Sequence, residues 1–91
     1  MSNRLEGKVA AITGAASGFG AAAAQRFVKE GGRVVLGDIQ SDAGLALAAQ
    51  LGDAARFCVC DVTQEDHVAN LVDTAVSAFG KIDIMYNNAG I

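Results

Sequence analysis

Residues 13–20, TGAASGFG, contain three glycines and no charged side chain, and they directly follow the apolar residues VAAI. Glycine lacks a Cβ atom, so a glycine-rich backbone can turn sharply and lie close to a ligand. The N–H groups at the start of a helix bind anions, phosphates among them. We assign the tight turn to Gly14 and a clear path to the anion to Gly18 and Gly20, with the Ser17 hydroxyl and N–H beside it. The segment therefore predicts a phosphate-binding loop between a strand and a helix.

The spacing of these glycines leaves the interpretation open when it is considered alone. It is G-x3-G-x-G, which differs from the G-x-G-x-x-G pattern of many dinucleotide-binding loops. Gly18, Gly20 and Ala23 do fit the variant G-x-G-x-x-A. An ordinary tight turn can also be rich in glycine, so the rest of the chain has to decide between the two interpretations.

Four short apolar runs are spread along the chain: KVAAIT at 8–13, RVVLGD at 33–38, ARFCVCDV at 55–62 and KIDIMYN at 81–87. They show little polar alternation, which is typical of strands buried on both faces. Helical patterns fill the three gaps, so the order is βαβαβαβ. This order predicts an α/β fold with a parallel sheet, right-handed crossovers and helices on both faces. We expect the fourth strand to carry an uncovered apolar flank and an unpaired edge.

The three predicted helices have recognisable starts and stops. A serine or threonine N-cap and a glycine just past the last turn are the common boundary signals. The first helix is predicted to begin near Gly18 and to end at the glycines 31–32. The second is predicted to have Ser41 as its N-cap and to end at 51–52. The third is predicted to have Thr63 as its N-cap, paired with Asp66, and to end at Gly80. In the third helix, apolar residues recur between 68 and 79 at helical spacing, so one stripe is expected to face the sheet.

The composition limits the classes of function. Of the 91 residues, 52% are hydrophobic and 19% are charged, which is typical of a single globular domain over 1–91. The net charge of −3 and the lack of a basic cluster argue against nucleic-acid binding. No apolar stretch approaches the roughly 20 residues that span a bilayer, so we expect a soluble, cytoplasmic chain without a membrane partner. Cys58 and Cys60 are interpreted as small buried hydrophobes, and with one histidine we assign no metal.

Two acidic residues follow predicted strands at the edge where open α/β sheets bind ligands. Asp38 ends the second strand 18 residues after Gly20, close to where a carboxylate accepts hydrogen bonds from an adenosine ribose. Because Ile39 and Gln40 follow it rather than a basic residue, NAD is favoured over NADP; the alternative is a solvated aspartate that caps the next turn. Asp61 ends the third strand, and its carboxylate can accept from an adenine amine, or it only helps to cap the third helix.

Together these residues resemble the N-terminal half of a short-chain dehydrogenase/reductase. The resemblance rests on four motifs in order: Thr13-Gly14-x-x-x-Gly18-x-Gly20, Asp38, Asp61-Val62, and NNAG at 87–90. It covers the whole chain. It implies a Rossmann-type doubly wound parallel sheet, here partial, with strand order 3-2-1-4. The three residues between the first two glycines favour the alcohol/ketone oxidoreductase branch of the family.

The resemblance also implies a role for each matching residue. Thr13 is expected to form hydrogen bonds toward the NNAG segment, and the Asn87 side chain to brace the sheet. Ser17 and Phe19 would contact the cofactor phosphates and the neighbouring ribose, Asp38 the adenosine ribose, and Asp61 and Val62 the adenine. Residues 88–90 would lie beside the cofactor's ribose. The implied NAD-binding residues are Gly14, Ser17, Gly18, Phe19, Gly20, Asp38, Ile39, Asp61, Val62, Asn88, Ala89 and Gly90.

The catalytic residues of the resembled family are not found in these 91 residues. The family uses a tyrosine with a lysine four residues later, a serine and an asparagine, all downstream of NNAG. The single tyrosine here, Tyr86, is followed four residues later by Gly90, and His67 falls in the first turn of a helix. We therefore expect the chain alone to be inactive and the intact protein, implied to be a homo-oligomer, to interconvert a secondary alcohol and a ketone.

Two alternatives remain open from the sequence. One is a non-catalytic module that binds the dinucleotide. The other is a fragment that folds poorly or associates through its uncovered strand.

Overall fold

The structure is a computed structural model that describes residues 4–16 and 18–88. Strands and helices alternate in the predicted order. The elements are β1 (Val9–Thr13), α1 (Gly18–Lys29), β2 (Arg33–Asp38), α2 (Ser41–Leu51), the 3-10 turn η1 (Gly52–Ala54), β3 (Ala55–Val59), α3 (Glu65–Phe79) and β4 (Ile84–Asn87). In the part of the chain that the structure describes, no helix has both the length and the apolarity to span a bilayer.

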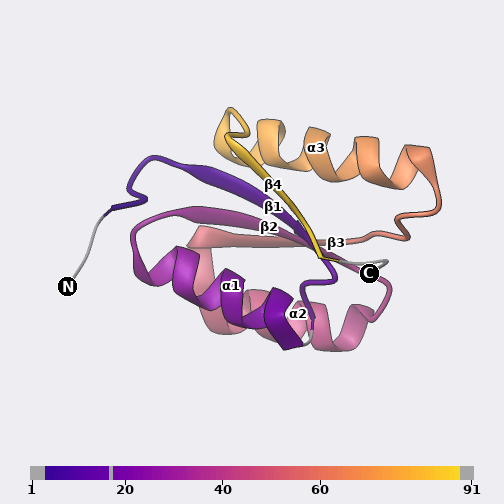
Figure 1. The fold of residues 1–91 in the computed structure, drawn as a ribbon, viewed down its shortest axis with the longest axis horizontal. Helices are drawn as coiled ribbons and strands as arrows, with labels where there is room; N and C mark the ends of the chain where they lie inside the picture. The colour runs from indigo at the N-terminus through magenta and orange to yellow at the C-terminus, as the bar shows by residue number, and fades with distance from the viewer. Residues whose placement is uncertain (1–3, 17, 89–91) are drawn as a thin grey trace.

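The four strands form one parallel sheet with the order β3-β2-β1-β4, which confirms the prediction of a Rossmann-type sheet. Helices α1 and α2 lie on one face and α3 on the other (Figure 1). In the strand register Thr13 lies opposite both Gly37 and Asn87, and Asp38 lies opposite Val59. The carboxyl ends of all four strands therefore meet at one edge of the sheet.

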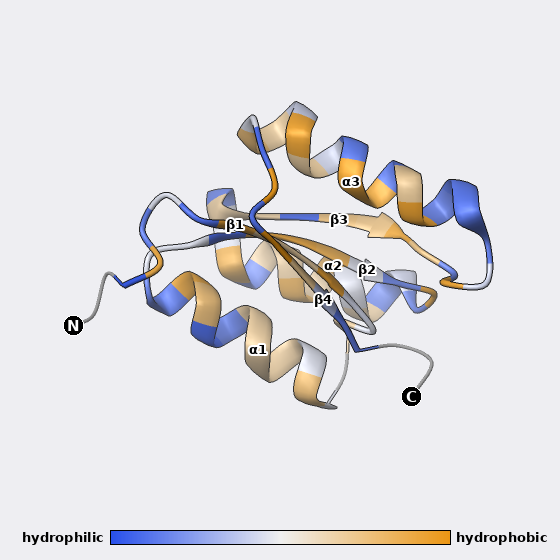
Figure 2. Ribbon diagram, turned by 45° about the horizontal axis from the view of Figure 1, so that its top comes forward, coloured by the Kyte–Doolittle hydropathy of each residue, from blue (hydrophilic) through white to orange (hydrophobic). Residues whose placement is uncertain are grey.

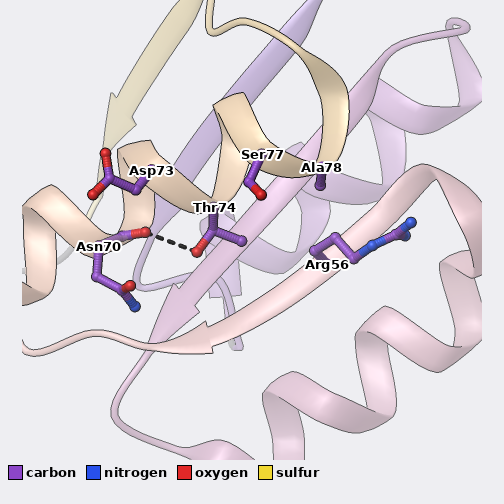
Figure 3. Close-up of a pocket in the computed structure, with 6 residues that line it drawn as sticks. All are labelled: Arg56, Asn70, Asp73, Thr74, Ser77 and Ala78. Carbon is purple, nitrogen blue, oxygen red and sulfur yellow. Dashed lines mark hydrogen bonds between the residues drawn. The ribbon is translucent and has the colours of Figure 1, made fainter.

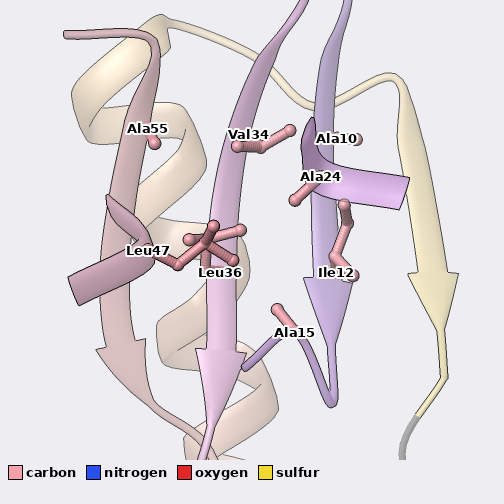
Figure 4. Packing of buried hydrophobic residues seen from close by; sticks show 8 residues of the cluster. All are labelled: Ala10, Ile12, Ala15, Ala24, Val34, Leu36, Leu47 and Ala55. Atoms are coloured by element: carbon pink, nitrogen blue, oxygen red, sulfur yellow. The ribbon is translucent and has the colours of Figure 1, made fainter. Parts of the chain in front are cut away.

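Two apolar clusters hold these layers together, one on each face of the sheet. In β1, Ala10 and Ile12 point toward α1 and α2, while Val9 and Ala11 point toward α3, as the two-residue period of a strand requires. Figure 4 shows the first cluster, in which Ala24 of α1 packs near β1. Figure 2 shows the sheet mostly in apolar colours and the first turn of α3 in hydrophilic ones. The central strands therefore have no polar face.

The edge strands differ from the prediction that all four runs are buried on both faces. β1 is buried at every position and β2 at all but its first, whereas all four residues of β4 are exposed. The side chains of Ile84, Met85 and Tyr86 each expose 40–42% of their surface. The reason is positional, since an edge strand has a neighbour on one side only and the described helices pack on the other three strands. Within residues 4–16 and 18–88, the apolar side chains of β4 are thus partly exposed.

The predicted start of the first helix at Gly18 is confirmed, as are the predicted stops, whereas the N-caps predicted for the second and third helices are wrong. Thr63 is not the N-cap of α3, because Gln64 occupies that position and the Thr63 hydroxyl donates instead to Asp61 Oδ1 at 2.6 Å. Ser41 is the first residue of α2, and the N-cap residue before it makes no side-chain capping bond. Gly80 has φ +84° and donates its N–H to the carbonyl of Val76 at 2.8 Å, as a terminating glycine does.

Candidate functional site

The carboxyl ends of β1 and β4 are joined by a buried hydrogen-bond network centred on Thr13. Its side chain is fully buried, and Oγ1 donates to Asn87 Oδ1 at 2.8 Å while accepting the N–H of Asn88 at 3.0 Å. The Asn88 side chain donates in turn to the carbonyl of Gly14 at 3.3 Å. These contacts confirm the bracing roles predicted for Thr13 and Asn87, and they tie the glycine-rich loop to the end of β4.

The glycine-rich loop crosses from the end of β1 to the end of β2. Gly14 has φ +64°, a left-handed conformation that glycine adopts without strain, so it makes the predicted tight turn. The next two N–H groups are then used in order: Ala15 donates to the carbonyl of Gly37 at 3.1 Å, and Ala16 donates to Asp38 Oδ2 at 2.9 Å. The loop is therefore anchored to β2 immediately before α1 begins.

Gly18 and Gly20 have different tasks, although the sequence suggested one task for both. A Cβ on Gly20 would lie 2.1 Å from the carbonyl oxygen of Gly14, so the missing side chain makes room for the loop backbone. Gly18 has φ +56°, and among the described residues nothing lies within 4 Å of its Cβ position. The open space at the start of α1 is thus at Gly18.

Asp38 is a buried carboxylate, with 6% of its surface exposed, at the same rim as the loop. Besides the bond from Ala16 to Oδ2, Oδ1 accepts the N–H of Gln40 at 2.9 Å. Asp38 therefore does cap the turn that follows β2, as the alternative interpretation predicted. This does not exclude ribose binding, because an ionised carboxylate has about four acceptor positions and two N–H groups fill only half of them. Ile39, next in the chain, is 68% exposed.

Asp61 follows β3 in a tight polar turn beside the end of β2. The carbonyl of Asp38 accepts the N–H of Cys60 at 3.0 Å, which places the turn next to that residue. Asp61 Oδ1 accepts both the hydroxyl and the N–H of Thr63, and these two bonds hold the pKa of Asp61 below its ordinary value of 3.8. The half-buried Val62 lies within the turn. Asp61 thus shapes the approach to α3 without being its N-cap.

The remaining predicted residues are placed only in part. Phe19, in the first turn of α1, is 82% exposed. Ser17, Ala89 and Gly90 lie outside the described residues, so their predicted contacts stay predictions. Tyr86 lies within β4, as the sequence indicated.

Two contributors were missed by the sequence analysis. The N–H of Ala16 anchors the loop to Asp38, but a backbone amide gives no signal in the sequence. His67 Nδ1 accepts the N–H of Asp61 at 3.1 Å, a contact that the sequence analysis did not predict. A lone histidine six residues after a strand-ending aspartate was the available signal.

A shallow pocket of about 340 Å³ lies elsewhere, between β3 and α3. Figure 3 shows that Thr74 and Ser77 face it from α3, and that the guanidinium of Arg56 points away from them. The lining residues are Arg56, Asn70, Asp73, Thr74, Ser77 and Ala78. None of them belongs to the predicted site, because this pocket is not at the carboxyl edge of the sheet.

The two cysteines and the histidine do not form a metal site. Within residues 4–16 and 18–88, no group of three or more His, Cys, Asp or Glu side chains is arranged to hold a metal ion. Both thiols are free and belong to the cluster beneath α3, Cys60 as a buried member and Cys58 as a half-buried neighbour. Burial raises the pKa of both thiols above the ordinary 9.0, so they behave as small apolar groups.

Comparisons with known proteins agree with this geometry. A family model for the short-chain dehydrogenases matches residues 8–91. Tropinone reductase-like 2 of Erythroxylum coca is 59% identical over 88 residues, which are 97% of this chain and 32% of that protein. The 3-alpha-(or 20-beta)-hydroxysteroid dehydrogenase of Mycobacterium tuberculosis is 52% identical over 91 residues, or 100% of this chain and 35% of that protein.

A solved structure is similar in fold as well as in sequence. It is that of 3-ketoacyl-(acyl-carrier-protein) reductase from Brucella melitensis in complex with NADH, with a TM-score of 0.85 and 46% identity over 88% of this chain and 33% of that chain. The present chain therefore spans about a third of the length of these relatives. Because the family model covers nearly the whole chain and the fold agrees, the chain belongs to the short-chain dehydrogenase family.

Proposed function

We propose that this chain is the NAD-binding portion of a short-chain dehydrogenase/reductase that interconverts a secondary alcohol and a ketone. One observation carries the proposal: the N–H of Ala16 donates to Asp38 Oδ2 at 2.9 Å. This bond brings the start of α1 and the carboxylate at the end of β2 to one rim of the sheet. A dinucleotide needs both groups on one rim, because it presents a diphosphate and a ribose side by side.

The residues present fit the diphosphate part of such a ligand. The first N–H groups of a helix have no partner within the helix, and the positive end of the helix dipole lies there. The first helical residue, Gly18, leaves open space where a side chain would stand. An anion can therefore approach the backbone of α1 closely. We assign Ser17 and Phe19 to the same region.

The adenosine part of the ligand is assigned to the ends of β2 and β3. Asp38 keeps two acceptor positions for ribose hydroxyls, and its negative charge would repel a 2′-phosphate. This argues for NAD over NADP. Asp61 and the N–H of Val62 are assigned to the adenine edge. The exposed side chain of Ile39 stands next to Asp38, where an adenine ring could cover it.

The other end of the ligand is assigned to the end of β4. Asn88 is held by Thr13 and Gly14, so the backbone that follows it starts from a fixed point beside the loop. We place the second ribose of NAD against 88–90. When bound, the nicotinamide would supply or accept the hydride. The residues of this chain bind and orient the cofactor, and the groups that move the proton belong to the rest of the intact protein.

The names of the relatives support the reaction class. They include reductases and a hydroxysteroid dehydrogenase, and one solved relative holds NADH.

We propose that the intact protein is a cytoplasmic homo-oligomer. Tyr86 is not assigned a catalytic role, because the residue four positions later is Gly90 and because it sits within β4.

Calorimetric titration of the 91-residue chain with NAD and with NADP tests the proposal. We expect weak binding with NAD preferred. Asp38→Ala should weaken NAD binding about tenfold or more, since it removes a charged acceptor, and should weaken NADP binding less. Asp73→Ala, which removes an exposed aspartate from α3, is the control for net charge.

Each outcome bears on a separate part of the proposal. Absence of heat with both dinucleotides would overturn the binding function. An unchanged ratio of NAD to NADP affinity in Asp38→Ala would remove the ribose assignment. Turnover of secondary alcohols by this chain alone would contradict the location of the proton-transfer groups. It would also exclude the non-catalytic module that the sequence left open.

A further inference from the structure

A side-chain hydrogen bond connects the two ends of the turn between β3 and α3. The family resemblance assigns no role to the residue that accepts it. His67, in the first turn of α3, accepts the N–H of Asp61 on Nδ1 at 3.1 Å. The carbonyl of Asp61 accepts the N–H of Gln64 at 2.9 Å, and the carbonyl of Gln64 accepts the N–H of His67 at 3.1 Å. The imidazole therefore links the end of β3 directly to α3.

The bond to His67 sets the orientation of the backbone at the end of β3. Two consecutive N–H groups are held in different directions: that of Cys60 by the carbonyl of Asp38, and that of Asp61 by His67. Together they fix the peptide planes on both sides of Cys60. These planes determine the direction of the next two residues. They orient the carboxylate of Asp61 and the N–H of Val62. Among the hydrogen bonds that the described residues of this turn make, none uses the N–H of Val62.

A histidine can accept through Nδ1 only when it is neutral and carries its proton on Nε2. Protonation adds a hydrogen to Nδ1, so two N–H groups would then face each other and the bond from Asp61 would be lost. Histidine ordinarily changes charge between pH 5 and 8. The closed turn therefore belongs to the neutral form.

We propose that His67 is a positioning residue for the adenine side of the site, and that the turn it closes binds NAD best when its imidazole is neutral. The inference rests on the proposed function, because it takes Asp61 and Val62 as the adenine contacts. It goes beyond that function by adding a residue that touches no part of the cofactor. It also predicts a pH dependence of binding that no direct contact would produce.

The charged and titratable groups around the imidazole act on its protonated form with opposite signs. The carboxylate of Asp61 lies on the turn, where its two hydrogen bonds from Thr63 lower its pKa. Glu65 and Asp66 share the first turn of α3. At the end of β3, burial and then the nearby Cys58, Asp61 and Asp38 raise the pKa of the Cys60 thiol, so these groups lie close to the start of the turn. The carboxylates attract an imidazolium, whereas the positive end of the α3 dipole and the N–H of Asp61 repel it.

Two variants of nearly the same shape separate positioning from bulk. His67→Asn places an acceptor oxygen at the δ position of the histidine nitrogen and does not titrate. His67→Leu places a methyl group there and offers no acceptor. NAD binding of the 91-residue chain and both variants is measured by calorimetry between pH 8 and pH 5.5, with far-UV circular dichroism to confirm folding.

We expect NAD affinity of the unaltered chain to fall about threefold to tenfold between pH 8 and pH 5.5, which is the effect of one hydrogen bond. His67→Asn should keep most of the pH 8 affinity and vary less over the same range. His67→Leu should be weaker at pH 8 and equally flat. Protonation of NAD or of any other group would appear in all three proteins and so cancels from the comparison.

Parallel pH profiles for the unaltered chain and His67→Asn would overturn the role of His67 while leaving the binding function intact. Absence of NAD binding at pH 8 would overturn the proposed function and this role with it. The N–H of Asp61 gives a second measurement that needs no ligand. Its NMR signal should shift with the His67 titration, and its hydrogen exchange should be faster in His67→Leu than in His67→Asn. A signal that ignores the titration would also contradict the proposal.

Discussion

Replacing Asp38 with alanine removes a carboxylate that holds two parts of the backbone at once. Oδ2 accepts the N–H of Ala16 in the glycine-rich loop, and Oδ1 accepts the N–H of Gln40 before α2, each at 2.9 Å. The side chain is buried, so water cannot easily take its place. The substitution therefore tests whether this carboxylate organises the loop in addition to any contact with a ligand.

The expected loss of stability follows from these two bonds. A hydrogen bond to a charged group contributes about 1.5 kcal/mol at the lower end of its range, so two contribute about 3 kcal/mol. Relief of the cost of burying the carboxylate offsets part of this, which leaves a net loss of about 2 kcal/mol. For a chain of 91 residues this corresponds to a fall of about 10 °C in Tm.

Urea unfolding followed by far-UV circular dichroism measures the loss without any ligand. Asp73→Ala makes the same change of charge at an exposed position of α3 and should alter the free energy of unfolding by less than about 0.5 kcal/mol. Asp38→Asn keeps one acceptor oxygen and turns an NH₂ group toward the other N–H, so it should lose at least one bond. If Asp38→Ala lowered the unfolding free energy by less than about 1 kcal/mol, the carboxylate would not be the anchor of the loop.

Three further substitutions test other parts of the site. Gly20→Ala should destabilise the chain by about 1–3 kcal/mol in urea unfolding, because its Cβ would meet the carbonyl of Gly14; a gain in stability, which helix propensity alone predicts, would refute the steric argument. Thr13→Val should cost about 2 kcal/mol by the same measurement, since Oγ1 both donates to β4 and accepts the N–H of Asn88, and an unchanged midpoint would show that the network contributes little. Hydrogen bonds from the first residue of β1 and from a lysine lower the pKa of Asp83 below 3.8, so its stabilising effect is complete above about pH 4 and is lost as the pH falls through the lowered value. Asp83→Asn should lose less stability than the unaltered chain in acid, and equal losses would count against this assignment.

The sequence predicts most of the fold because burial on both faces leaves a clear pattern in β1 and β2. It predicts the burial of the edge strands less well. The residues of β4 are as apolar as those of β1, so the sequence does not show which of the two strands lies at the edge of the sheet. The N-cap of α3 was wrong for a local reason. Thr63 had two possible partners, the N–H groups of α3 and the carboxylate of Asp61, and only geometry decides between them.

The candidate site shows the same division. Residues with a chemical signature, such as Asp38 and the glycines, were placed at the expected edge of the sheet. The close approach of Gly20 to the loop was not predicted, because it depends on where the carbonyl of Gly14 points. The contribution of Ala16 lies entirely in its backbone, which any residue but proline would supply.

The bond between Thr13 and Asn87 joins positions 74 residues apart, and this has a consequence for synthesis on the ribosome. β1 can pair with β2 early. Its other edge stays unpaired until β4 has been synthesised, about 45 residues after β2. At 5–20 residues per second, that edge is unpaired for about 2–9 seconds in every nascent chain. A chaperone that captures open strand edges has that interval in which to act, and among the four described strands the β1–β4 pair is the last to form.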